Sequence, residues 1–129
     1  MSDVHLVSIL YVDDEPLIQD MVEAALHDAG FSVVLATTPA EALEAVKAPG
    51  LRGLVTDINL AHPIDGWEVA RRAREAHPQL PVVYVSGLAE GEWTVKGVPQ
   101  SLMIPKPFVP AQIIVALSTL MVLPLPRMI

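Results

Sequence analysis

The sequence contains no cysteine, and its eight lysine and arginine residues are outnumbered by 15 aspartate and glutamate residues. Without cysteine the chain forms no disulfide bond and performs no thiol chemistry, as is usual for a cytoplasmic protein. The formal net charge of −7 argues against nucleic acid and anionic membrane surfaces as direct partners. The first residues also lack the basic and then apolar pattern of an export signal, so we expect a cytoplasmic location.

Long hydrophobic runs are absent as well. The most apolar segment, residues 110–123, is too short for the bilayer, because a membrane-spanning helix needs roughly 20 apolar residues. We therefore expect no membrane insertion. A hydrophobic fraction of 52% with 18% charged residues instead indicates a compact globular chain. At 129 residues the chain is long enough for one domain with a buried core.

Short apolar segments alternate with segments of helical periodicity along the chain. The expected strands are residues 6–12, 31–36, 54–57, 81–85 and 102–105, and the expected helices are residues 16–29, 39–48, 66–76 and 110–123. Residues 89–99 contain two glycines and a proline, so we expect the fourth helix there to be short or irregular. This alternation predicts an α/β fold with a parallel sheet and right-handed crossovers.

Polar residues stand at the ends of four of these apolar strands. Asp57 ends the third strand, Asp13 and Asp14 follow the first, and Ser86 and Lys106 follow the last two. In a parallel sheet the carboxyl ends of the strands lie at one edge, where open α/β sheets bind their ligands. One such residue alone has a simpler explanation, since Asp57 could cap its loop and Lys106 could be a solvated surface residue. Together they predict three acids, one hydroxyl and one ammonium at the same edge.

These motifs, in this order, resemble the receiver domain of two-component response regulators. The resemblance covers essentially the whole chain and includes the Asp-Gly-Trp-Glu segment at residues 65–68. It implies a doubly wound α/β fold, with a five-stranded parallel sheet of order 2-1-3-4-5 and helices on both faces. We expect the receiver domain to span residues 1–123 and residues 124–129 to form an apolar tail.

The resemblance also implies a phosphoacceptor and a magnesium site. Asp57 would take a phosphoryl group from a histidine kinase or a histidine phosphotransfer protein, because an ionised carboxylate can form an acyl phosphate. Asp14 and Asp57 would bind Mg²⁺ through their side chains. Asn59 would contribute its backbone carbonyl, and Asp13 would act through a water molecule. Three crowded acids repel one another, which is a further reason to expect a cation among them.

Five more residues complete this family pattern or depart from it. By resemblance, Lys106 would contact the phosphoryl oxygens, and Pro107 would aim it through a cis peptide bond. Ser86 would donate a hydrogen bond to the phosphoryl group and so report its presence, and Gly87 would leave room for the donor and for water. Met103 stands where the family often has tyrosine or phenylalanine. A thioether can fill that space but cannot move a polar tip between solvent and core.

The last expected helix is apolar on more than one of its faces, and the tail that follows it is also apolar. A helix that is apolar all round is covered on more than one side. We therefore expect an interface at Ile114, Val115, Val122 and Leu123. This interface would form a homodimer or bind a helix of a kinase or phosphotransfer protein. The alternative is that the tail folds back over its own domain.

We interpret the chain as a stand-alone receiver that acts as a signalling switch. It would not be an enzyme, since it would catalyse only its own phosphorylation and slow dephosphorylation. A pseudo-receiver that binds its partners regardless of phosphate is the alternative, because of Met103 and the irregular fourth helix. A haloacid-dehalogenase-like phosphatase is less favoured, because Pro16 departs from the signature of that family and no cap domain fits within 129 residues.

Overall fold

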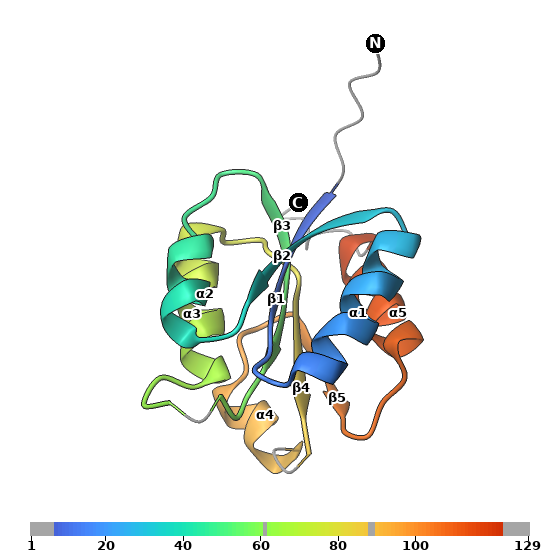
Figure 1. The fold of residues 1–129 in the computed structure, drawn as a ribbon. Helices are drawn as coiled ribbons and strands as arrows, with labels where there is room; N and C mark the ends of the chain where they lie inside the picture. Colours follow the sequence, from blue (N-terminus) through green and yellow to red (C-terminus); the bar gives the residue numbers. More distant parts are fainter. Residues whose placement is uncertain (1–6, 61, 88–89, 123–129) are drawn as a thin grey trace.

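One parallel sheet forms the centre of the protein (Figure 1). The computed structural model describes residues 7–60, 62–87 and 90–122, so the expected tail at residues 124–129 lies outside the described residues. All strand pairs are parallel, and the strand order is β2-β1-β3-β4-β5. This order confirms the predicted fold class. The strands are β1 (Val7–Val12), β2 (Phe31–Ala36), β3 (Leu51–Asp57), β4 (Val82–Ser86) and β5 (Ser101–Pro105).

Helices cover both faces of the sheet (Figure 1). One face carries α1 (Pro16–Asp28) and α5 (Pro110–Val122), and the other carries α2 (Pro39–Ala45) and α3 (Gly66–Ala76). The helix α4 (Glu90–Lys96) has only seven residues, which confirms the short fourth helix. In the part of the chain that the structure describes, none of the helices combines the length and the apolar character needed to cross a membrane.

Each layer of helices closes its own apolar core against the sheet. In β1, Ile9 and Tyr11 pack toward α1 and α5, whereas Leu10 and Val12 pack toward α2 and α3. Successive side chains of a strand point to opposite faces, so a strand covered on both sides is apolar at nearly every position. This explains the continuous apolar segments of the sequence.

β3 begins at Leu51, earlier than the predicted start at residue 54. Gly53 pairs with Ile9 of β1 and is part of the strand. A Cβ atom at Gly53 would lie 2.6 Å from Cδ1 of Ile9, so the isoleucine side chain takes the space that a side chain at Gly53 would need. The glycine therefore lies within the strand and does not mark its beginning.

The start of α3 packs directly on the backbone at the end of β3. The side chain of Asp65 caps this helix and accepts a hydrogen bond from the Glu68 amide at 3.0 Å. The Gly66 amide donates to the Ile58 carbonyl oxygen at 2.9 Å. A Cβ atom at Gly66 would overlap the carbonyl oxygen of Asp57 and lie 2.7 Å from Cα of Ile58. α3 thereby fixes the backbone of Asp57 and Ile58.

We expect Gly66→Ala to lower the free energy of unfolding by about 1–3 kcal/mol, because the added methyl group forces rigid backbone apart. Urea denaturation followed by circular dichroism measures this change. Gly50→Ala is the matched control, since a Cβ atom at Gly50 meets no heavy atom within 4 Å. Equal unfolding free energies for the two variants would show that α3 does not pack rigidly on β3.

Candidate functional site

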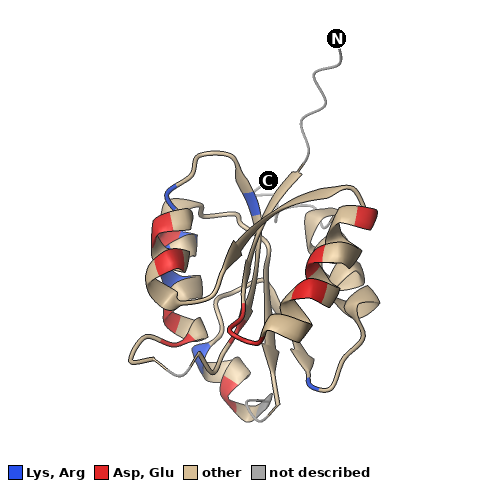
Figure 2. Cartoon of the chain, in the orientation of Figure 1, with Lys and Arg blue, Asp and Glu red and all other residues tan. Residues whose placement is uncertain are grey.

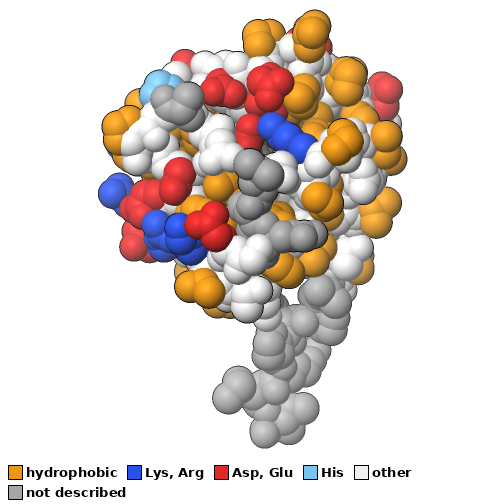
Figure 3. Space-filling view, turned by 90° about the horizontal axis from the view of Figure 1, so that it is seen from below, with side chains coloured by type: hydrophobic (Ala, Val, Ile, Leu, Met, Phe, Trp, Pro, Cys, Tyr) orange, Lys and Arg blue, Asp and Glu red, His pale blue; other side chains and the backbone are white. Residues whose placement is uncertain are grey.

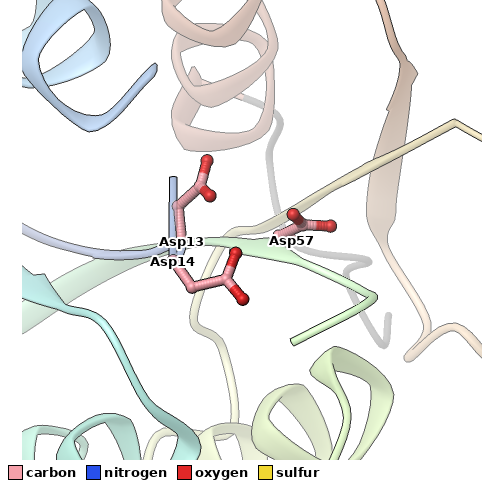
Figure 4. Close-up of side chains that lie close together, drawn as sticks. All are labelled: Asp13, Asp14 and Asp57. Carbon is pink, nitrogen blue, oxygen red and sulfur yellow. The ribbon is translucent and has the colours of Figure 1, made fainter. Parts of the chain in front are cut away.

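The carboxyl ends of β1 and β3 bring three acids together. Asp13 and Asp14 follow β1 and Asp57 ends β3, and Figure 4 shows them projecting from neighbouring strand ends. Each of the three has a carboxylate oxygen within 4.8 Å of the others. Asp13 and Asp57 are only 2% and 4% exposed, whereas Asp14 is exposed to solvent. The structure thus brings the three predicted acids together at one edge of the sheet.

The surface around the acids contains little positive charge. Figure 2 shows acidic residues at the carboxyl ends of β1 and β3 and along the outer helices. Seen from that end of the sheet, Figure 3 shows a mostly acidic group of side chains with basic atoms beside it and hydrophobic side chains nearby, and a second group in which acidic and basic side chains are mixed. Lys106 is the cation that contacts the acids: its Nζ lies 2.9 Å from Oδ2 of Asp57 and 3.4 Å from Oε1 of Glu15.

Burial dominates the electrostatics of Asp57. Desolvation raises the pKa of this carboxyl group, the hydrogen bond and charge of Lys106 lower it, and the charge of Asp13 raises it again. The net pKa lies above the ordinary value of an aspartate. The Asn59 amide donates to Oδ1 at 3.2 Å, so both oxygens of Asp57 accept a hydrogen bond. Burial lowers the pKa of Lys106, but the hydrogen bond and charge of Asp57, together with the charges of Asp13 and Glu15, leave this pKa above its ordinary value.

Asp13 is held by four hydrogen bonds with four different residues: it accepts three and donates one. Its Oδ2 accepts from the Tyr11 hydroxyl at 2.6 Å, and its Oδ1 accepts from the Glu15 amide at 3.0 Å. Its carbonyl oxygen accepts from the Gln19 side-chain amide, and its own amide donates to Ala36 at 3.1 Å. Burial and the hydrogen bond to Asp13 raise the pKa of Tyr11 far above its ordinary value, so the hydroxyl keeps its proton and donates.

Tyr11 and Gln19 were not predicted from the sequence to be part of the site. A signal existed for Tyr11, because residues two apart in a strand share one face, and Tyr11 precedes Asp13 by that spacing. Gln19 is a polar residue on a helix face that is otherwise apolar, and it is 6% exposed. Buried polar side chains need partners, but the sequence alone does not show that the partner of Gln19 is the backbone of Asp13.

The remaining predicted site residues belong to β4, to β5 and to the residues that directly follow these strands. Ser86 is buried at the end of β4, and its carbonyl oxygen accepts from the Lys106 amide at 2.9 Å. A Cβ atom at Gly87 would meet no heavy atom within 4 Å, so this position borders open space. The Lys106–Pro107 peptide bond is cis, as the resemblance implied. Met103 is half-buried and pairs with Tyr84 across β4 and β5.

The predicted interface residues of α5 differ in their exposure. Ile114 is half-buried and packs against the core beneath α1 and α5, whereas Val115 and Val122 are 64% and 78% exposed. Val115 and Met103 contribute to a groove of about 420 Å³ between β5 and α5. Leu123 lies outside the described residues.

Comparison with known proteins gives consistent matches. A family model described as the response regulator receiver domain matches residues 9–118. A solved response regulator receiver protein from Sinorhizobium medicae WSM419 is 46% identical, with a TM-score of 0.86, and the match covers 90% of this chain and 94% of that chain. The receiver domain of NtrX from Brucella abortus is 32% identical, with a TM-score of 0.74 and coverages of 87% and 96%.

Matches to curated proteins involve only a part of each relative. The transcriptional regulatory protein TrcR of Mycobacterium tuberculosis is 36% identical over 80 residues, which are 62% of this chain and 31% of TrcR. A putative NtrX-like response regulator of Rickettsia conorii is matched over 24% of its length. The chain therefore spans about a quarter to a third of the length of these relatives.

With divalent cations chelated, we expect Asp57→Asn to raise the free energy of unfolding at neutral pH, because the folded protein then no longer holds this buried charge. The raised pKa of Asp57 means that the folded state binds its proton more tightly than the unfolded state does. The wild type therefore loses stability as pH rises from the ordinary aspartate pKa through the raised one. The higher unfolding free energy of Asp57→Asn relative to wild type should be present above this pH range and should disappear below it.

Urea denaturation at a series of pH values measures this difference. Asp20→Asn is the control, since Asp20 is an exposed acid on α1 and its substitution should leave stability nearly unchanged. A stability difference between Asp57→Asn and wild type that does not depend on pH would contradict the argument.

Proposed function

Because the chain belongs to the response regulator receiver domain family, we propose that Asp57 accepts a phosphoryl group from a phosphohistidine. The donor would be a sensor histidine kinase or a histidine phosphotransfer protein in the cytoplasm. The observation that carries this proposal is the buried Asp57 carboxylate, which contacts Lys106 and lies beside Asp13 and Asp14. We place the receiver domain at residues 1–123, of which residues 9–118 match the family model.

The reaction forms an acyl phosphate on Asp57. A carboxylate oxygen attacks phosphorus, the P–O bond forms, and the P–N bond to the donor imidazole breaks with its electron pair going to nitrogen. Water later hydrolyses the acyl phosphate to aspartate and inorganic phosphate. Phosphoryl transfer spreads negative charge over the equatorial oxygens. The ammonium group of Lys106, already 2.9 Å from Oδ2 of Asp57, would contact these oxygens.

The acids also fit a divalent cation. Three carboxylates with oxygens within 4.8 Å of one another provide the hard oxygen ligands that Mg²⁺ prefers. Asp14 and Asp57 would bind it through their side chains, and Asn59 through its backbone carbonyl. Asp13 would act through water. When bound, Mg²⁺ would offset the negative charge of the acids and of the phosphoryl oxygens.

Phosphorylation would act as a switch of protein contacts. The Ser86 hydroxyl would donate to a phosphoryl oxygen, and Gly87 would leave the approach open. Met103 offers no polar tip, so the change at β4 would be transmitted through apolar packing along β5 and α5. The chain would accordingly act as a signalling switch that catalyses only its own phosphorylation and slow dephosphorylation.

A second copy of the chain is the partner that we propose for α5. Val115 and Val122 are exposed, and α5 contains no charged residue. Two copies of a chain with a net charge of −7 can therefore meet here without strong repulsion. The interface would include the groove that Met103 and Val115 line.

Incubation with acetyl phosphate and Mg²⁺ should add one phosphoryl group to the wild type and none to Asp57→Asn, since only Asp57 provides the nucleophile. Intact mass spectrometry detects the adduct. Asp20→Asn, at an exposed acid of α1, should be modified like the wild type, and omission of Mg²⁺ should abolish the adduct. A folded wild type without any adduct would favour a pseudo-receiver, which Met103 and the short α4 also allow.

Light scattering after size-exclusion chromatography should show the molar mass of a dimer at high protein concentration. Val115→Glu should remain monomeric, because it places a carboxylate in the interface. Leu17→Glu is the control, since Leu17 is 81% exposed on α1 and should not affect the dimer. A wild type that is monomeric at every concentration would rule out the homodimer.

A further inference from the structure

Two buried side chains hold Asp13 from inside the domain. Tyr11 is 1% exposed and donates its hydroxyl proton to Oδ2 of Asp13 at 2.6 Å. Gln19 is 6% exposed and donates its side-chain amide to the carbonyl oxygen of Asp13. Tyr11 lies in β1, which ends one residue before Asp13, whereas Gln19 reaches Asp13 from α1. Asp13 is thus fixed both at its carboxylate and at its backbone.

These contacts orient Asp13 without neutralising it. A phenol hydroxyl and an amide are neutral donors, and the Glu15 amide at Oδ1 is neutral as well. The nearby ammonium group of Lys106 contacts Asp57 and Glu15 instead. Both carboxylate oxygens of Asp13 are therefore held in place by neutral donors.

Asp14, at the same edge of the sheet, lacks the hydrogen bonds that hold Asp13 among the described residues. It is exposed, and within the described ranges its carboxylate accepts no hydrogen bond. Ordering a free side chain on binding costs conformational entropy, whereas a side chain already fixed by its neighbours has lost that freedom during folding. Of these two adjacent acids, Asp13 is the one whose orientation is set before any ligand arrives.

We propose that Tyr11 and Gln19 are positioning residues of the divalent-cation site, which they serve by fixing the orientation of Asp13. This inference rests on the proposed function, because it assumes that the acids bind a cation. Because Asp13 would act on the cation through water, it is itself an outer partner of the site, and the loss of a correctly oriented outer partner commonly weakens metal binding 10- to 100-fold. Phenylalanine at position 11 keeps the ring in the core and removes only the hydroxyl, so it tests the hydrogen bond itself.

The test uses Mn²⁺ alone as the probe, with no phosphodonor. Electron paramagnetic resonance measures the concentration of free Mn²⁺, from which the dissociation constant follows. Tyr11→Phe should raise the dissociation constant about tenfold, and Gln19→Met should change it in the same direction. Competition with Mg²⁺ should show the same order of affinities. Urea denaturation shows whether each variant is folded. If Tyr11→Phe is unfolded, the affinity of Gln19→Met for Mn²⁺ tests the proposal instead.

Tyr84→Phe is the matched control. Tyr84 is also a fully buried tyrosine two residues before a polar strand end, but its hydroxyl accepts from the Val98 amide at 3.0 Å and does not contact the acids. Its loss should leave the Mn²⁺ dissociation constant unchanged. Equal weakening by Tyr11→Phe and Tyr84→Phe would assign the effect to general packing and overturn the proposal.

A double-mutant cycle connects the effect to Asp13. In the Asp13→Ala background, Tyr11→Phe should change the dissociation constant less than about twofold, because the acid that Tyr11 positions is gone. A full tenfold effect in that background would overturn the positioning role. Wild type that binds no Mn²⁺ would refute the cation site and this inference together, whereas wild type that binds as weakly as Tyr11→Phe would refute the inference alone.

Discussion

Repulsion among three carboxylates at one edge of the sheet is the constraint on which the arrangement of the site depends. Asp13, Asp14 and Asp57 lie within 4.8 Å of one another, and the ammonium group of Lys106 contacts only Asp57 among them. Burial still raises the pKa of Asp57 despite this contact, so one ion pair does not offset the loss of water. The site therefore has a deficit of positive charge, which a divalent cation would correct.

The fold holds the acids together against this repulsion. Parallel pairing of β1 with β3 places their carboxyl ends side by side, and apolar cores on both faces prevent the strands from separating. On the face covered by α2 and α3, close contact between Gly66 and the backbone of Asp57 fixes the end of β3. The energy that keeps the acids close thus comes from hydrophobic packing and backbone pairing elsewhere in the domain.

The β5 and α5 side of the molecule combines an apolar groove with exposed valines. Met103 fills the position from which a tyrosine or phenylalanine would connect the site to the surface, and Val115 lines the same groove. Packing of this kind transmits changes of shape more readily than changes of charge. This packing fits the proposal that a protein contact on α5 is the output of phosphorylation at Asp57.

The residues of the sequence predicted a parallel α/β sheet and the gathering of Asp13, Asp57 and Lys106 at one edge, whereas the strand order and the helices on both faces were implied by the resemblance to receiver domains. Apolar periodicity and the polar residue after each strand depend only on local order along the chain, which the sequence states directly. The predicted start of β3 was wrong, because Gly53 lies within the strand to leave space for the Ile9 side chain of neighbouring β1. The hydrogen bond from Gln19 of α1 to the backbone of Asp13 could not be predicted from the sequence. It depends on the distance between α1 and the end of β1, which apolar periodicity does not specify.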